Sequence, residues 1–167
     1  MPTFAHFDAQ DPLEDAMCVS AFLISANKDG ILAGRMKDPK AWSSLDRVSA
    51  MGLGFREDLW VLPAGHLHVG EHPDAAAERI ASDQLRARLR DLRLWHVLSY
   101  AEPMPSRNQD LHWDLCFVYK ANLEVPAIPP WFSELRRLPL SKLSSAMFAR
   151  GHGEIVEELA LFPEPWV

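Results

Sequence analysis

The chain has 167 residues and a formal net charge of −6, and 48% of its residues are hydrophobic. This composition excludes a disordered chain, and the negative charge argues against a general nucleic-acid-binding surface. No stretch approaches the roughly 20 consecutive apolar residues of a membrane-spanning helix. We therefore expect one globular domain over residues 1–167, with a loose polar lead-in over residues 1–15.

The two cysteines, Cys18 and Cys116, both lie in apolar runs. Free cysteine is among the most buried residue types, so we expect two buried thiols and neither a disulfide nor a metal pair. This favours a reduced, cytoplasmic setting. The acidic N-terminal segment also lacks the pattern of a secretory signal peptide.

The first elements in chain order are two predicted strands. Residues 17–24 form a continuous apolar run, and residues 31–35 follow a turn at 27–30 that contains Asn, Asp and Gly. This pattern predicts a β-hairpin. Residues 36–58 have weak periodicity and mixed charge, and we expect a short helix or an ordered loop there.

The central stretch, residues 59–87, predicts a strand, a glycine-containing loop and a helix. Its first four residues are apolar, and Pro63 ends this run. The glycines that follow allow the backbone to bend sharply. Pro73 suits the first position of a helix, and three alanines soon after it favour helix formation.

This stretch resembles the Nudix box. In that family a Gly is followed after five residues by a Glu and after seven more by an Arg, and Gly65, Glu71 and Arg79 fit these positions. Four positions after the arginine depart from the family pattern: Ile80 replaces Glu, Asp83 and Gln84 replace a Glu-Glu pair, and Arg86 replaces Gly.

The resemblance implies an α+β fold of the Nudix type, an α/β/α sandwich with a mixed central sheet and the box as a loop followed by a helix. It also implies a Mg²⁺ or Mn²⁺ site, since such hard cations take oxygen ligands and bridge the phosphates of a substrate. At about 100° per residue, positions 80, 83 and 84 share one helical face. Because Ile80 offers no ligand atom, we expect Asp83 and Gln84 to be the remaining metal-binding and catalytic candidates, with weak metal affinity.

The resemblance gives other residues a role as well. It implies that Glu71 and Arg79 tie the loop that contains Gly65 to the helix. Arg35 follows the second predicted strand, where Nudix proteins often have an arginine, and is a candidate phosphate ligand. The alternative for Arg35 is an exposed charge at the end of a strand.

Three histidines surround the box loop: His66, His68 and His72. A zinc-type site is one interpretation and a solvated loop is the other. Their spacing matches no standard zinc pattern, which favours the solvated loop.

Later residues predict further elements. Residues 94–100 and 113–119 have strand character, and a proline-rich crossing follows at 125–130. Residues 140–148 are expected to begin a helix after a Leu-Pro turn, and residues 151–161 to form an amphipathic terminal helix.

Two groups of charged residues belong to this part of the chain. We expect three arginines on the exposed side and end of the box helix: Arg86, Arg88 and Arg90. Four residues are reserve candidates for a further metal ligand or base: Glu102, Asp110, His112 and Asp114.

Three functions fit these observations. The first is metal-dependent hydrolysis of a nucleoside diphosphate linked to another moiety, by an impaired or atypical site. The second is a catalytically inactive nucleotide-binding module, and the third is a protein-interaction module, since fold alone does not settle function. The expected partner is a nucleotide-type small molecule, with no nucleic acid and no membrane. The resemblance leaves a homodimer open, because Nudix proteins are often dimers.

Overall fold

In the computed structural model of the protein, the described residues are 17–38, 57–104, 109–149 and 151–161, and of 101–104, 109–112 and 160–161 only the backbone is described. The predicted lead-in and most of residues 36–58 lie outside this range. The strands are β1 (Met17–Ile24), β2 (Ala26–Asn27), β3 (Gly30–Met36), β4 (Trp60–Val61), β5 (Ala64–His66), β6 (Arg88–Met104), β7 (Gln109–Glu124) and β8 (Phe132–Leu138). The helical segments are α3 (Pro73–Arg79), a π-helical turn η1 (Ile80–Gln84), the 3₁₀ turns η3 (Leu140–Lys142) and η4 (Ser145–Met147), and α4 (His152–Leu161).

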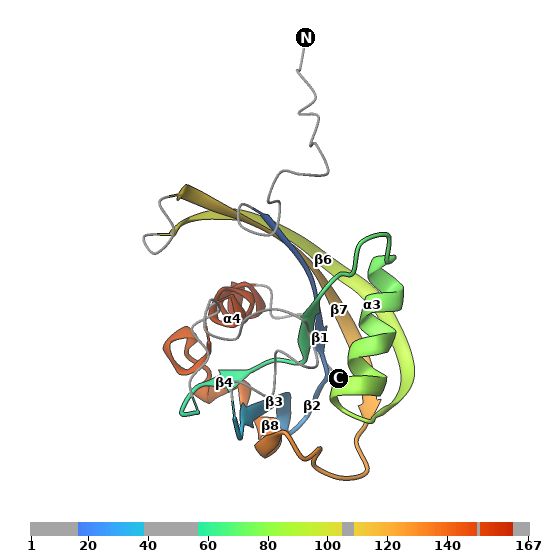
Figure 1. The fold of residues 1–167 in the computed structure, drawn as a ribbon. Helices are drawn as coiled ribbons and strands as arrows, with labels where there is room; N and C mark the ends of the chain where they lie inside the picture. The colour runs from blue at the N-terminus through green and yellow to red at the C-terminus, as the bar shows by residue number, and fades with distance from the viewer. Residues whose placement is uncertain (1–16, 39–56, 105–108, 150, 162–167) are drawn as a thin grey trace.

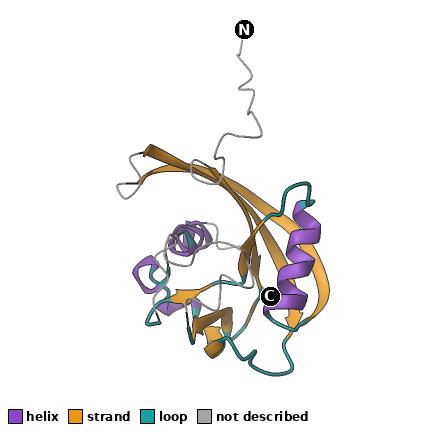
Figure 2. Ribbon diagram, viewed as in Figure 1, coloured by secondary structure: helices purple, strands orange, loops and turns teal. Residues whose placement is uncertain are grey.

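The described strands form two four-stranded sheets (Figure 2). The first has the order β5-β1-β7-β6, in which β1 runs parallel to β7 and the other pairs are antiparallel. In the second, β3 pairs with β8 along one edge and with the short strands β2 and β4 along the other. The mixed sheet and the α+β class predicted from the sequence are therefore confirmed.

Strand β1 is buried on both faces, which explains its continuous apolar sequence. Ala21 and Leu23 belong to a core cluster with the residues of α3, whereas Phe22 and Ile24 belong to a second cluster with the residues of α4. Figure 1 shows α3 and α4 on opposite sides of β1. The alternation of side chains along the strand thus builds two helix-covered layers around one sheet.

Two predicted helical segments are wrong. The chain leaves the box helix at Arg86, which has a φ of 50°, and β6 begins at Arg88. Arg88 and Arg90 are exposed on either side of the part-buried Leu89, which is the alternation of a strand. The segment from Leu140 to Phe148 forms the two 3₁₀ turns, because its three serines favour turns over a continuous helix.

The terminal helix agrees with expectation, but only one of the two thiols is buried as expected. In α4, the apolar residues Ile155, Val156 and Leu159 are buried. Both cysteines are free, Cys116 buried and Cys18 half-buried. Burial raises the pKa of the Cys116 thiol to about 12. None of the described helices is long and apolar enough to cross a membrane.

Candidate functional site

The loop before α3 is tied to the helix by Glu71 and Arg79. Arg79 donates through Nε to Glu71 Oε1 at 2.8 Å and through Nη2 to Glu71 Oε2 at 2.9 Å. The same Nη2 donates to the carbonyl of His66 at 2.8 Å, and the backbone N–H of His68 donates to Glu71 Oε2 at 2.9 Å. The structure therefore brings together the two residues that the sequence assigned to this junction.

Burial makes this pair structurally important. The side chains of Arg79 and Glu71 are 17% and 14% exposed. The hydrogen bond from Arg79, aided by the backbone N–H of His68, lowers the pKa of Glu71 to about 2 against the opposing effect of burial. Gly65, the first residue of the box pattern, is buried in β5 opposite Ala21 of β1. The ion pair thus fixes the loop between β5 and α3.

The start of α3 is fixed by two further contacts. His72 caps the helix, because its Nδ1 accepts from the backbone N–H of Asp74 at 3.2 Å. The hydroxyl of Tyr119 in β7 donates to Asp74 Oδ1 at 2.6 Å. Burial and this bond to Asp74 raise the pKa of Tyr119 above its usual range. His72 therefore has a structural role in the described loop.

The box helix ends in a π turn, and this changes which residues share a face. The backbone N–H of Leu85 donates to the carbonyl of Ile80, an i→i+5 bond of 3.4 Å. Ile80 and Gln84 are 0% and 1% exposed, whereas Asp83 is exposed. The expected common face for positions 80, 83 and 84 is not formed, because the wider turn directs Asp83 outward while Ile80 and Gln84 enter the core.

The Gln84 amide joins the end of the helix to the loop. Its Nε2 donates to the carbonyl oxygen of Ala64 at 2.5 Å, and its own backbone carbonyl accepts from Trp131 Nε1 at 2.8 Å. Asp83 instead accepts a local bond of 2.7 Å from the hydroxyl of Ser82. The two residues that the sequence proposed as a joint metal site therefore point into different environments.

A divalent cation does not fit this arrangement. Ile80 has no ligand atom, and the Ala64 carbonyl already accepts a hydrogen bond from the Gln84 amide. Gln84 Oε1 is buried and accepts no bond from a described residue, but one neutral oxygen is far short of the six or so that Mg²⁺ takes. Within the described residues no group of three His, Cys, Asp or Glu side chains could hold a metal. The side chains of Glu102, Asp110 and His112 lie outside the described part.

Arg35 lies in β3, beside the short strand β4. Its guanidinium lies 4.5 Å from the ring centroid of Trp60 and 3.7 Å from a carboxylate oxygen of Glu134. Arg136 of β8 also stacks on Trp60, at 5.2 Å, and pairs with Glu134 at 2.9 Å. Two guanidinium groups thus share one carboxylate, and Arg35, with a side chain 38% exposed, faces solvent in part.

His152 is a buried histidine whose tertiary contact was not predicted from the sequence. It opens α4, is buried, and accepts a 3.0 Å bond at Nδ1 from the backbone N–H of Leu62, 90 residues away. Phe22 contacts it edge-on, with ring centroids 5.1 Å apart. Burial, with a smaller effect of His66, lowers the pKa of His152 to about 3. No local sequence pattern predicts this hydrogen bond, because only the tertiary fold brings His152 close to Leu62.

The pKa values of His152 and Glu71 predict acid sensitivity. Both are lower in the folded protein, at about 3 and about 2, than their ordinary values of 6.5 and 4.5, so the unfolded chain binds more protons as pH falls. The contribution of His152 to the free energy of unfolding should be constant above pH 6.5 and should fall by about 1.4 kcal/mol per pH unit below it. The contribution of Glu71 is lost between pH 4.5 and about 2.

Urea unfolding followed by circular dichroism between pH 8 and pH 5 measures this effect. His152→Asn keeps an acceptor for Leu62 N–H but removes the titration, so its stability should vary less over this range. An equal slope in the wild type and in His152→Asn would show that His152 is not the group responsible.

Comparisons with known proteins agree with this architecture. A family model described as NUDIX domain matches residues 15–159. The MutT NUDIX hydrolase from Burkholderia pseudomallei is 18% identical, with a TM-score of 0.58 over 86% of this chain and 98% of that one. The NUDIX domain of Shewanella oneidensis NrtR, solved with ADP ribose, is 14% identical, with a TM-score of 0.56 over 92% and 93%. At such identities the likeness shows the fold alone, and no curated protein matched the sequence.

Proposed function

The chain belongs to the NUDIX domain family, and we propose that it is a binding module for a nucleotide-type small molecule, whose box supports the fold and does not hydrolyse the ligand. Hydrolases of this family generally use divalent metals, which offset charge developing on phosphate oxygens. In this chain the end of the box helix is joined to the preceding loop by a hydrogen bond between Gln84 and Ala64. Binding without metal-dependent turnover is therefore the function that the geometry supports best.

The hydrogen bond from Gln84 Nε2 to the Ala64 carbonyl is the observation that carries this proposal. A cation at a loop–helix junction holds oxygen atoms of both segments together. Here the amide N–H of Gln84 takes the place of a cation. It donates to the Ala64 carbonyl and so joins the helix to the loop without a metal. The arrangement keeps the architecture of the box while removing the group that would activate water.

Two observations support a nucleotide-type ligand: the NUDIX family of the chain and the positive charge around Arg35. The structurally similar NUDIX domain of Shewanella oneidensis NrtR was solved with ADP ribose. In this chain, Arg35 and Arg136 share the single carboxylate of Glu134, which leaves one positive charge uncompensated among the three side chains. Arginine is well suited to phosphate oxygens, and we propose Arg35 as the phosphate-binding residue.

Calorimetric titration with ADP ribose in the presence of EDTA tests the binding proposal. We expect saturable binding that EDTA does not weaken, and a loss of about tenfold in affinity for Arg35→Gln, since hydrogen bonds to charged groups contribute about 1.5–3 kcal/mol. Arg90→Gln is the matched control, because Arg90 is an exposed arginine paired with Glu124 on the other sheet. Binding that disappears in EDTA would contradict the proposal.

Gln84→Glu tests the replacement of the metal directly. Ile80 and Gln84 are both buried, but only Gln84 already carries an oxygen atom beside the Ala64 carbonyl, so the new carboxylate is placed there. The new carboxylate would face the Ala64 carbonyl with no proton between them, so we expect a loss of about 3 kcal/mol at neutral pH. Millimolar Mn²⁺ should recover part of this loss in a thermal melt and should leave the wild type and Gln84→Leu unchanged. Equal stabilisation of all three proteins would oppose this account.

Hydrolysis through Asp83 is the alternative. Asp83 is exposed and could meet a phosphate-bound metal brought in by the substrate, so an assay of metal-dependent turnover separates the two functions. A cytoplasmic setting and a homodimer remain predictions from the sequence.

A further inference from the structure

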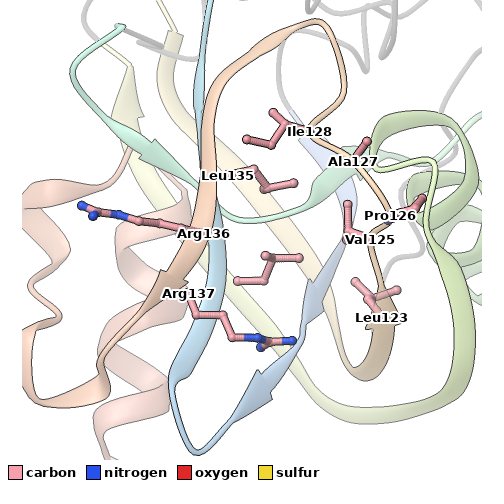
Figure 3. Close-up of a pocket in the computed structure, with 9 residues that line it drawn as sticks. Leu123, Val125, Pro126, Ala127, Ile128, Leu135, Arg136 and Arg137 are labelled. Atoms are coloured by element: carbon pink, nitrogen blue, oxygen red, sulfur yellow. The ribbon is translucent and has the colours of Figure 1, made fainter.

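A pocket of about 360 Å³ opens between the end of β7, the loop that follows it, and the second sheet (Figure 3). This volume lies in the range of small-molecule sites. Its apolar wall includes Leu32, Leu123, Val125, Ile128 and Leu135. The box residues 64–87 do not line it, so it is distinct from the site described above.

Arg137 is the charged group of this pocket. Its Nη1 donates to the carbonyls of Ser25 at 2.7 Å and Gly30 at 3.3 Å, and its Nη2 donates to Ser25 Oγ at 3.3 Å. All three acceptors are neutral, and no described carboxylate forms an ion pair with Arg137. The half-buried guanidinium lies next to an apolar wall, where burial lowers its pKa and the more distant carboxylate of Asp29 opposes this shift to a smaller extent.

The neighbouring arginine does not share this position. Arg136 also lines the pocket, but side chains alternate along β8, so its guanidinium is directed away from the face that carries Leu135 and Arg137. Arg136 stacks on Trp60 and pairs with Glu134. Figure 3 shows the Arg136 side chain extending away from the apolar residues, and the Arg137 side chain extending along one end of the pocket.

We infer that this pocket binds a small apolar carboxylate, with its hydrocarbon body against the aliphatic wall and its carboxylate at Arg137. A guanidinium held by neutral acceptors still has an N–H at Nε and one at Nη2 that no described residue engages, and a carboxylate can accept such a pair in a planar, two-bond contact. A partly buried cation is also stabilised by an opposite charge far more than an exposed one. Charge and apolar surface thus select the same class of ligand, which lies beyond the proposed nucleotide function.

Calorimetric titration with octanoate tests the inference. We expect saturable binding to the wild type, and at least about tenfold weaker binding of octan-1-ol, which has the same body without the charge. Arg137→Gln should weaken octanoate binding about tenfold. Arg136→Gln is the matched control, because it removes the same charge from the adjacent residue on the opposite face, and its affinity should stay within about twofold of wild type.

Ile128→Glu provides a second variant that leaves folding intact, because Ile128 is 55% exposed. A carboxylate at this position of the wall should repel octanoate and leave octan-1-ol binding nearly unchanged. The inference is overturned if the wild type does not bind octanoate saturably, or if Arg136→Gln weakens binding as much as Arg137→Gln does.

Discussion

Arg79→Ala is expected to lower the free energy of unfolding by about 3 kcal/mol or more, because it leaves a buried carboxylate without its partner. Glu71 is only 14% exposed, and its pKa of about 2 requires the hydrogen bond from Arg79. The substitution also frees the His66 carbonyl that Arg79 holds. Urea unfolding at pH 7 measures the loss.

The control is Asp83→Ala, four residues along the same helical segment. Asp83 is exposed and accepts a local bond from Ser82, so its removal should change stability by no more than about 0.5 kcal/mol. Arg79→Lys should recover little, since one ammonium cannot reproduce the planar two-bond contact. Equal melting temperatures for Arg79→Ala and Asp83→Ala would contradict the assignment of Arg79 to the loop–helix junction.

Gly30→Ala is expected to have the second large effect, a loss of about 2–5 kcal/mol, for two reasons. Gly30 begins β3 with a φ of +124°, which side chains rarely adopt. A Cβ atom there would also lie 1.9 Å from the carbonyl oxygen of Leu138, a backbone atom of the paired strand β8. Relief of this contact requires the two strands to move apart.

Gly70→Ala separates the two causes. Gly70 also has a positive φ, of +80°, but a Cβ atom there would meet nothing within 4 Å. Its substitution should therefore cost about 1–2 kcal/mol from the backbone alone. Thermal or urea unfolding of both variants provides the comparison, and equal losses would show that contact with Leu138 is not the main cost of Gly30→Ala.

Several elements that carry a local signal were predicted correctly, but the hairpin of residues 17–24 with 31–35 is wrong, because β1 and β3 lie in different sheets and β3 pairs with the short strand β2 instead. Strand β1 has the predicted bounds, 17–24, because all its residues except Ser20 are apolar. Helix α3 begins at Pro73 and α4 ends the described chain, as the proline and the apolar periodicity indicate. The error over Arg88 and Arg90 has a physical reason, since the charges were assigned by sequence distance from the helix, while the alternation with Leu89 is typical of a strand.

The contacts that decide the candidate site depend on tertiary structure. Gln84 contacts Ala64, which lies 20 residues earlier in the sequence. The Gln84 side chain is directed into the core by a π turn that no sequence pattern predicted. His152 and Leu62 are brought together although they lie 90 residues apart in the sequence. Glu71 and Arg79 lie together, as the resemblance to the Nudix box implies, and this contact spans only eight residues of the sequence.

Turnover of nucleoside diphosphates, triphosphates, dinucleotides and nucleotide sugars with Mg²⁺ or Mn²⁺ is the most direct test of the account. Phosphate release after coupling to a phosphatase or pyrophosphatase gives the readout. We predict no metal-dependent turnover by the wild type, because the amide of Gln84 closes the loop–helix junction. Metal-dependent turnover that Asp83→Ala abolishes would contradict this prediction and identify a working hydrolase with an unusual ligand set.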